Sequence, residues 1–423
     1  MIDIKFFRDN LDHIEKSLSR RGYSLQKDKF IALDLERKSL QVEVESLQSE
    51  RKALSSDFGK LKSSGENTDN LKKKIDSINN NLKSKNESLN LILESINSIL
   101  LDIPNIPHES TPDGKNENDN VVIRTVRKIT SKNTVDHIDI TKKIDTDLAA
   151  KLAGARFAVL KGSLAKLQRA LISLMLDTAQ KNGYEEFYLP YMANRESLIG
   201  TGNLPKFEED LFKTSDNLYL IPTAEVPLTN IYRDVLINEE QLPIKLTAHT
   251  PCFRSEAGSY GRDTKGLIRQ HQFEKIELFK ISNPETSMAE LEGLLANAEE
   301  ILQLLELPYQ VIQLCAGDIG FSSCKTFDIE VWMPSQNKYR EISSCSNFSD
   351  FQARRCNIKI KSKEGNYFAH TINGSGLAVG RTLIAILENY FNGGEYIKIP
   401  NSLAKYYGED TVYLWDTCLV NFS

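Results

Sequence analysis

Two runs of apolar residues at seven-residue spacing constrain the fold of this 423-residue chain more than any other feature. Leucines recur at this spacing from Leu33 to Leu61, and apolar residues recur in the same way from Ile75 to Ile96. The turn-forming stretch SSGENTDN at 63–70 separates the two runs. Two heptad runs of similar length around one sharp turn predict an antiparallel helical hairpin, and the turn favours it over a dimerising coiled coil.

The predicted hairpin, about residues 27–103, carries its charge unevenly. Arg37, Arg51 and Lys85 interrupt the apolar partner position of the heptads. Across residues 51–85, nine basic residues face only four acidic ones, a net charge of +5. A basic tip suits contact with a phosphate backbone, but a solvated polar tip has the same composition. Charge alone leaves both interpretations open.

The rest of the chain reads as a mixed domain. We expect an N-terminal domain at 1–104, a linker at 105–120 and a catalytic body at 121–423, because HESTPDGKNENDN at 108–120 has the composition of a linker. Strands grouped with long connections predict an α+β fold, an antiparallel sheet flanked by helices. The expected helices are 162–182, closed by Gly183, 285–306 and 376–391, and the expected strands are 187–190, 325–334 and 339–348.

Composition excludes several classes of protein. The chain has 40% hydrophobic and 26% charged residues, which is ordinary for a globular protein. It has no run of eighteen apolar residues and no apolar signal-peptide core, so we expect no membrane span and a cytoplasmic location. None of the six cysteines forms a C-x-x-C pair and the six histidines lack metal-binding spacing, so neither a disulfide framework nor zinc is expected.

The stretch FRSEAGSYGRDTKGLIRQHQFEKIE at 253–277 combines groups that suit a nucleotide. The guanidinium of Arg254 can bind a phosphate with two hydrogen bonds. In the returning strand, Phe273 and Glu277 fall on one face with Lys275, His271 and Arg269. The ring can stack on a base and the carboxylate can pair with a cation. An exposed hairpin with a charged outer face remains the alternative.

A second glycine-rich stretch, GSGLAVG at 374–380, precedes Arg381. Its spacing is G-x-G-x-x-x-G and fewer than fifty residues follow it, so a dinucleotide-binding βαβ unit is excluded. The glycines could serve close helix–sheet packing, whereas Arg381 favours a phosphate site.

These segments resemble those of bacterial-type seryl-tRNA synthetases, which are class II aminoacyl-tRNA synthetases. The stretch at 253–277 resembles motif 2, TINGSGLAVGRTLIAILENY at 371–390 resembles motif 3, and the helix leading to Pro190 resembles motif 1. TAEVPLTN at 223–230 and EISS at 341–344 are similar to the family's substrate segments. The hairpin resembles the family's tRNA-binding arm.

The resemblance implies roles for individual residues. Arg254 would hold the ATP α-phosphate, Arg381 the γ-phosphate and Glu256 the adenine amino group, while Phe273 would stack on the adenine. The implied ATP site further includes Ser255, Gln270, Glu341, Ile342, Ser343 and Ser344, of which Glu341 and Ser344 would coordinate Mg²⁺. The implied serine site comprises Thr223, Ala224, Glu225, Glu277 and Ser375.

The implied function is ATP-dependent ligation of L-serine to tRNA(Ser) through a seryl-adenylate, and also to tRNA(Sec) where that tRNA is present. The implied active form is a homodimer. Two alternatives are weighed. A synthetase-like ligase that loads a carrier protein would not need the long arm. A non-catalytic coiled-coil binding protein would not need Arg254, Glu277, Glu341 and Arg381.

Overall fold

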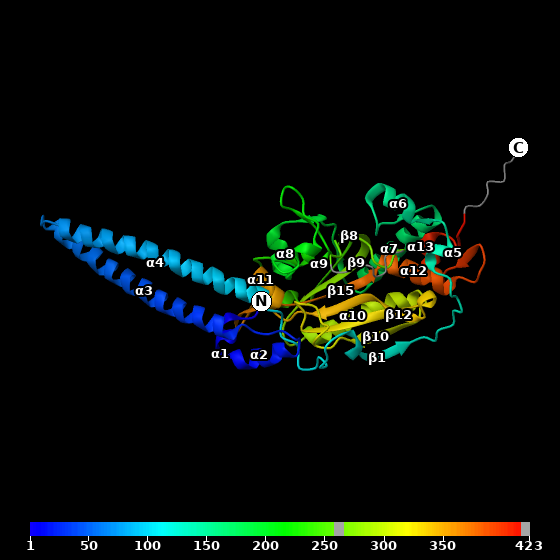
Figure 1. Cartoon of the computed structure of the whole chain (residues 1–423), viewed down its shortest axis with the longest axis horizontal. Coiled ribbons are helices and arrows are strands. Elements are labelled where there is room, and N and C mark those ends of the chain that lie inside the picture. The colour runs from blue at the N-terminus through cyan, green and yellow to red at the C-terminus, as the bar shows by residue number, and fades with distance from the viewer. Residues whose placement is uncertain (258–265, 416–423) are drawn as a thin grey trace. The chain divides into compact units, whose positions relative to one another are not determined.

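The computed structural model describes residues 1–257 and 266–415 (Figure 1). The chain forms two compact units. One is helical and consists of Lys5–Lys16 and Tyr23–Ile103. The other contains Met1–Ile4, Ser17–Gly22 and the chain from Pro104 onward. Among the described residues, no helix is both long enough and apolar enough to span a membrane.

The helical unit is built on two long helices, α3 (Lys27–Ser63) and α4 (Asp69–Asp102), preceded by the short helices α1 (Ile4–Asp9) and α2 (Leu11–Ser19). Helices α3 and α4 run antiparallel along each other, which confirms the predicted hairpin (Figure 1). Heptad residues form the seam, including Val44 of α3 and Ile78 and Leu82 of α4, all buried.

Two of the three charged residues that interrupt the heptads, Arg37 and Lys85, form ion pairs within the helical unit. The carboxylate of Asp34 is buried and accepts hydrogen bonds from Arg37 Nε at 2.8 Å and Arg8 Nε at 3.0 Å. Lys85 Nζ lies 2.6 Å from Glu43 Oε2 and thereby joins the two helices. Arg37 thus pairs within α3, whereas Lys85 pairs across the hairpin.

The larger unit contains an eight-stranded sheet with the order β1-β10-β11-β12-β15-β9-β8-β4. All neighbouring pairs are antiparallel except β4–β8. In sequence order, the strands are β1 (Val121–Val126), β4 (Glu185–Glu186), β8 (Ile244–Phe253), β9 (Gln272–Ser282), β10 (Tyr309–Gln313), β11 (Lys325–Met333), β12 (Lys338–Asn347) and β15 (His370–Ala378).

Helices cover both faces of this sheet. On one face, helices α7 (Ser163–Lys181), α10 (Ser287–Leu304) and α12 (Val379–Tyr390) bury Ile276 and Leu278 of β9 in the main core. On the other face, helices α9 (Glu225–Asn230) and α11 (Phe351–Cys356) pack in a second cluster with Phe279 and Ile281. Because side chains alternate along a strand, this second face also carries residues 273, 275 and 277.

Shorter elements complete the unit. The helices are α5 (His137–Ile140), α6 (Thr146–Ala153), α8 (Arg195–Thr201) and α13 (Asn401–Tyr407). The strands are β2 (Ile144–Asp145), β3 (Val159–Leu160), β5 (Met192–Ala193), β6 (Tyr219–Leu220), β7 (Leu236–Asn238), β13 (Lys359–Ser362), β14 (Gly365–Phe368), β16 (Tyr396–Lys398) and β17 (Thr411–Tyr413).

The helices expected at 162–182 and 285–306 and both later strands are confirmed within a few residues, but two predictions are wrong. Residues 187–190 form no strand, because pairing with β8 stops after Glu186 and Pro190 has no backbone N–H to continue it. The helix expected from 376 begins at Val379, since residues 376–378 still belong to β15. The domain boundaries at 104 and 121 remain predictions.

Removal of the Asp34 carboxylate should lower the local stability of the hairpin formed by α3 and α4. In Asp34→Ala, Arg8 and Arg37 lose their shared acceptor, and we expect a loss of about 2 kcal/mol, less than for a fully buried pair because Arg8 is partly exposed. Native-state hydrogen exchange of the α3 amides measures the local opening free energy. Asp57→Ala, which removes an exposed carboxylate 3.5 Å from Lys60, is the control. Equal exchange rates of the α3 amides in both variants would show that the Asp34 carboxylate does not stabilise the hairpin.

Candidate active site

A polar cavity of about 480 Å³ opens on the second face of the sheet. Its volume lies in the range of small-molecule sites. Strands β9, β12 and β15, the end of β8 and the starts of α9 and α12 supply its lining. Twelve residues predicted from the sequence line it together: Thr223, Glu225, Arg254, Glu256, Gln270, Phe273, Glu277, Glu341, Ile342, Ser344, Ser375 and Arg381.

Strand register explains why residues so distant in sequence meet here. Glu277 of β9 pairs with Ser375 of β15 on one side. Phe273 of the same strand pairs with Cys252 of β8 on the other, two residues before Arg254. Phe273 and Glu277 lie on the same face, about 13 Å apart along the strand. The exposed-hairpin alternative is therefore wrong, because Glu277 is only 2% exposed.

One end of the cavity holds a closed set of three polar side chains. Glu277 Oε2 accepts a hydrogen bond from Thr223 Oγ1 at 2.8 Å and lies 2.7 Å from Lys275 Nζ. Lys275 Nζ also donates to Thr223 Oγ1 at 2.9 Å. All three residues are buried. The ammonium group therefore compensates the buried carboxylate, which is a condition for keeping a charge in this place.

A second carboxylate, that of Glu225, lies beside this set. Burial and the negative charge of Glu277 raise the pKa of Glu225 to about 7. Its Oε1 accepts a hydrogen bond from Gln352 Nε2 at 2.6 Å, and Gln352 Oε1 in turn accepts from Thr371 Oγ1 at 2.7 Å. Gln352 is fully buried, so this chain of hydrogen bonds fixes Glu225 from behind.

The guanidinium of Arg254 lies over the ring of Phe273, with 5.2 Å between its central carbon and the ring centroid. Its Nε donates to Pro222 O at 3.3 Å. The next charged residue, Glu256, has φ +52°, a backbone conformation that non-glycine residues seldom adopt. Its Oε2 accepts from Arg269 Nη1 at 2.7 Å. Contacts with Pro222 and Phe273 thus hold Arg254 in place, and the contact with Arg269 holds Glu256.

Arg381 links two other parts of the lining. Its Nη1 donates to Glu341 O at 2.6 Å and its Nε to Ile268 O at 3.2 Å. The Glu341 carboxylate lies 3.7 Å from Nη1. Arg381 therefore ties strand β12 to the segment that returns from the loop after Arg254.

The sequence left two explanations for the glycines of GSGLAVG, close packing and a phosphate site, and the structure supports a different one for different glycines. A Cβ at Gly374 would come within 2.7 Å of Leu294 on α10, so this glycine permits close helix–sheet packing. A Cβ at Gly376 would come within 2.9 Å of Leu278 on the neighbouring strand β9. Gly380 instead lines the cavity beside Arg381, and a Cβ there would meet no atom closer than 3.9 Å.

Three predicted site residues have side chains that the cavity does not include. Ala224 is buried beneath it. Ser255 Oγ donates to Glu209 O at 2.5 Å, and Ser343 Oγ is buried against Ser375 O at 2.6 Å. The loop residues 258–265 lie outside the described residues. His271, expected on the cavity face, precedes β9, and its ring packs against Phe157 and Phe212.

Among the residues that the sequence did not assign to the site, Lys275, Asn373 and Gln352 contribute polar contacts to it. Lys275 was signalled by its alternation with Phe273 and Glu277. Asn373 lines the cavity beside Glu225, and its amide acts to lower the pKa of that carboxylate against the larger effect of burial. Only the alternation of β15 with Ser375 could have indicated Asn373. Nothing in the local sequence indicated Gln352.

Comparison with known proteins agrees with this arrangement. Residues 1–107 match the family described as seryl-tRNA synthetase N-terminal domain, and residues 206–390 match the tRNA synthetase class II core domain (G, H, P, S and T). A serine–tRNA ligase of Hydrogenovibrio crunogenus is 51% identical over 96% of this chain and 99% of its own. The chain belongs to the seryl-tRNA synthetase family.

Two further relatives are similar over different shares of the chain. A serine–tRNA ligase of Hydrogenobaculum sp. is 59% identical over 72% of this chain and 74% of its own. The crystal structure of the seryl-tRNA synthetase from Pyrococcus horikoshii complexed with ATP superposes with a TM-score of 0.89 at 36% identity, covering 98% of this chain and 100% of the other. The similarity to seryl-tRNA synthetases thus extends over both compact units.

Lys275 should stabilise the fold, because its ammonium group lies against the buried Glu277 carboxylate. In Lys275→Met, the Glu277 carboxylate stays buried with only the Thr223 hydroxyl as partner, so we expect a loss of about 3 kcal/mol in unfolding free energy by urea denaturation. The double variant Lys275→Met/Glu277→Gln removes both charges and should be less destabilised than the single variant. If Lys275→Met is as stable as the wild type, Lys275 does not compensate the buried Glu277 carboxylate.

Proposed function

We propose that this chain ligates L-serine to tRNA in two steps, through a seryl-adenylate made from ATP. The observation that carries the proposal is one cavity that joins Thr223, Glu225 and Glu277 to Arg254 and Arg381. Carboxylates at one end suit the ammonium and hydroxyl groups of serine. Guanidinium groups and an aromatic ring at the other suit the phosphates and adenine of ATP.

In the first step, an oxygen of the serine carboxylate attacks the α-phosphorus. The new O–P bond forms as the bond to the bridging oxygen of the β-phosphate breaks, and pyrophosphate leaves. Arg254 stabilises the charge on the α-phosphate, and Arg381 holds the γ-phosphate. Phe273 stacks on the adenine, with Glu256 at its amino group. Catalysis here is positioning and charge stabilisation without a side-chain nucleophile.

In the second step, a ribose hydroxyl of the 3′-terminal adenosine of the tRNA attacks the seryl carbonyl carbon. The ester bond forms, the mixed anhydride bond breaks, and AMP leaves. The hydroxyl proton passes to a phosphate oxygen of the departing AMP. Thr223, Glu277 and Ser375 hold the seryl group in place during this transfer.

The lining also fits Mg²⁺, which prefers oxygen ligands. Asp328 of β11 pairs with Ser344 of β12, and its Oδ1 is buried without a hydrogen-bond donor among the described residues. Burial and the charge of Glu341 raise the pKa of Asp328 well above its ordinary value. A cation there would give Asp328 Oδ1 a partner and would lower the pKa of Asp328. We propose that Glu341 and Ser344 hold Mg²⁺ with ATP, where it would neutralise phosphate charge.

Serine would be selected by hydrogen bonds to its hydroxyl group. Thr223, Glu277, Ser375 and Asn373 surround that end of the cavity with polar atoms. A site built to pair with a hydroxyl rejects the analogue that lacks it, because its own polar groups would remain unpaired. Alanine should therefore be a very poor substrate.

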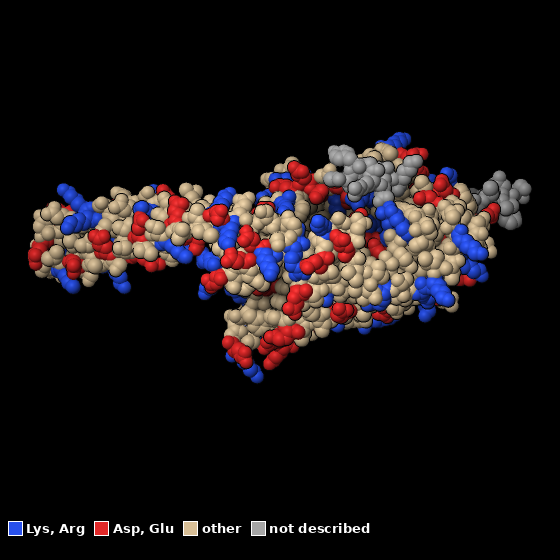
Figure 2. All heavy atoms as spheres, turned by 60° about the horizontal axis from the view of Figure 1, so that its bottom comes forward, with Lys and Arg blue, Asp and Glu red and all other residues tan. Residues whose placement is uncertain are grey.

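The arm supports a tRNA substrate over a carrier protein. Lys72, Lys73 and Lys74 are exposed near the turn between α3 and α4. On the face of the arm that Figure 2 shows, basic and acidic side chains are mixed along its length. The arm can thus contribute local phosphate contacts rather than one continuous basic surface. The proposed substrate is tRNA(Ser), with tRNA(Sec) as a second substrate where it exists.

We propose a homodimer as the active form. Tyr188 and Met192, which follow the motif 1 helix α7, are 88% and 50% exposed and are thus accessible to a second copy of the chain. The reaction belongs in the cytoplasm, where aminoacylated tRNA is used.

Amino-acid-dependent ATP–pyrophosphate exchange without tRNA tests the proposed activation step. We expect exchange with serine and at least 100-fold less with alanine or glycine. Arg254→Ala should reduce exchange by at least 1000-fold, because the charge on the α-phosphate loses its partner. The control Arg340→Ala removes a guanidinium that does not line the cavity and should leave exchange unchanged. Absence of exchange with any amino acid would overturn the proposal.

Shortening of the arm should separate the two steps. Glu43 and Lys85 face each other across the hairpin at 2.6 Å, so a short Gly-Ser turn can replace residues 44–84. We expect normal serine-dependent exchange but at least 100-fold slower transfer of serine to tRNA, because the distal phosphate contacts are lost. Undiminished transfer at physiological salt would contradict the role of the arm.

A further inference from the structure

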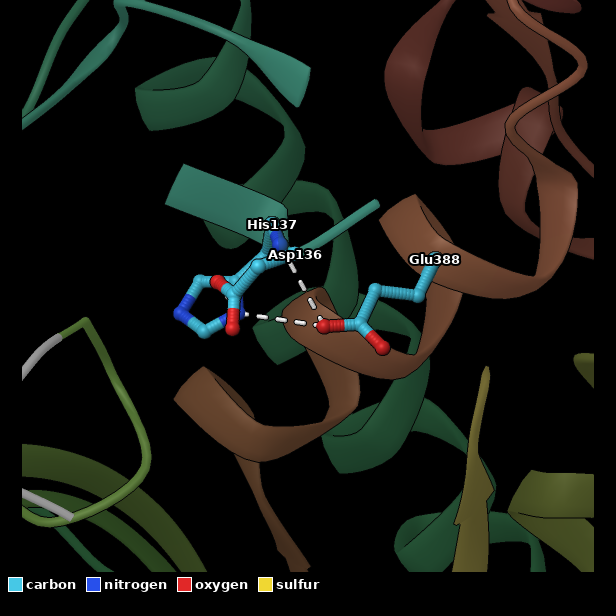
Figure 3. A group of neighbouring side chains, drawn as sticks. All are labelled: Asp136, His137 and Glu388. Carbon is cyan, nitrogen blue, oxygen red and sulfur yellow. Dashed lines mark hydrogen bonds and ion pairs between the residues drawn. The ribbon is translucent and has the colours of Figure 1, made fainter. Parts of the chain in front are cut away.

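A buried histidine outside the cavity joins two segments that line it. His137 begins helix α5 and is 1% exposed. Its Nδ1 lies 3.1 Å from Glu388 Oε1, and its backbone N–H donates to the same oxygen at 3.3 Å (Figure 3). Asp136 Oδ1 lies 2.9 Å from the same Nδ1. On the opposite side of the ring, Nε2 accepts a hydrogen bond from Leu267 N at 3.2 Å.

These contacts determine the proton positions on the imidazole. A backbone N–H can only donate, so Nε2 must be unprotonated to accept from Leu267. The proton of the neutral ring then sits on Nδ1, where the two carboxylates accept it. Figure 3 shows the Glu388 carboxylate directed at this nitrogen. His137 thus serves as an acceptor toward the loop and as a donor toward α12.

The same proton positions argue against a metal site. Asp136, His137 and Glu388 offer ligand atoms within 4.8 Å of one another. However, a cation on Nδ1 would displace the proton to Nε2, and Leu267 would lose its acceptor. Glu388 Oε2 is also occupied, because it accepts from Ser335 N at 3.0 Å.

The loop segment held by His137 is part of the cavity. Leu267 and Ile268 both line it, and Ile268 O accepts the hydrogen bond from Arg381 Nε. Glu388 lies on α12, two helical turns after Arg381. Gly266, with φ +73°, brings the backbone so close that a Cβ there would lie 2.1 Å from His137 Nε2. The ring is therefore clamped between the returning loop and the helix that carries Arg381.

We propose that His137 is a positioning residue for ATP: as a neutral acceptor it fixes the backbone at Leu267–Ile268 against α12, and this sets the position of Arg381. The inference rests on the proposed function, since it assigns His137 to the ATP end of that same cavity. Serine lies at the other end, around Glu277, and its binding should not depend on His137.

Protonation of His137 should release the loop. A proton on Nε2 faces the N–H of Leu267 and replaces attraction by repulsion. Burial opposes the charged ring, but Asp136 and Glu388 outweigh burial and raise the pKa of His137 above its ordinary value. Within residues 1–257 and 266–415, these two carboxylates are the charged groups that face the ring, one from the start of α5 and one from α12. The KM for ATP should therefore rise as the pH falls through this raised pKa.

Two matched variants separate the two functions of the ring. In His137→Asn, the amide reaches the place of Nδ1 and can donate to Glu388, but nothing accepts from Leu267. In His137→Gln, the amide oxygen reaches the place of Nε2 and can accept from Leu267. We expect the KM for ATP in pyrophosphate exchange to rise roughly tenfold in His137→Asn, with the KM for serine within twofold of wild type. His137→Gln should restore the KM for ATP and lose its increase at low pH.

Amide hydrogen exchange at Leu267 gives a readout that does not depend on activity. This amide should be protected in the wild type and in His137→Gln and unprotected in His137→Asn. An unchanged KM for ATP in His137→Asn, or equal increases in both KM values together with a lower Tm, would overturn the inference. If the wild type shows no serine-dependent exchange, the proposed function fails, and protection of Leu267 still decides the positioning role.

Discussion

The pairing of β9 with β8 on one side and β15 on the other is the constraint on which the rest of this structure depends. One face of β9 is buried by α7, α10 and α12, and this apolar contact fixes which residues face the opposite way. A shift of one residue would exchange the two faces. Phe273, Lys275 and Glu277 then turn toward the cavity, while Ser375 and Arg254 arrive from the neighbouring strands.

A site with one buried and one half-buried carboxylate needs side chains that hold both of them in place. Lys275 compensates Glu277, and Gln352 holds Glu225 through hydrogen bonds that are withdrawn from water. His137 supports the other end in the same manner, because it connects the returning loop to α12. The cavity is therefore prepared before any ligand enters, as a reaction that depends on positioned charge requires.

The parts of the fold and of the site that follow a periodic sequence pattern could be predicted from the sequence. Heptads indicated the hairpin, and alternation placed Phe273 and Glu277 on one face. Supporting residues such as Gln352 and His137 escaped because each meets its partner only through the tertiary fold, 127 residues away for Gln352 and Glu225. Residues 187–190 resembled a strand because apolar content was visible but the lack of a pairing partner was not. The roles of individual residues came from the family resemblance rather than from any pattern.

The central claim is that one cavity holds both halves of a seryl-adenylate and recognises the seryl hydroxyl. Isothermal titration calorimetry with a non-hydrolysable seryl-sulfamoyl adenosine, compared with its alanyl analogue, tests it most directly. The account predicts tight binding of one seryl compound per chain and at least 100-fold weaker binding of the alanyl compound. Equal affinity for the two compounds would contradict it, because the polar groups around Glu277 would then make no distinction between a hydroxyl and a hydrogen atom.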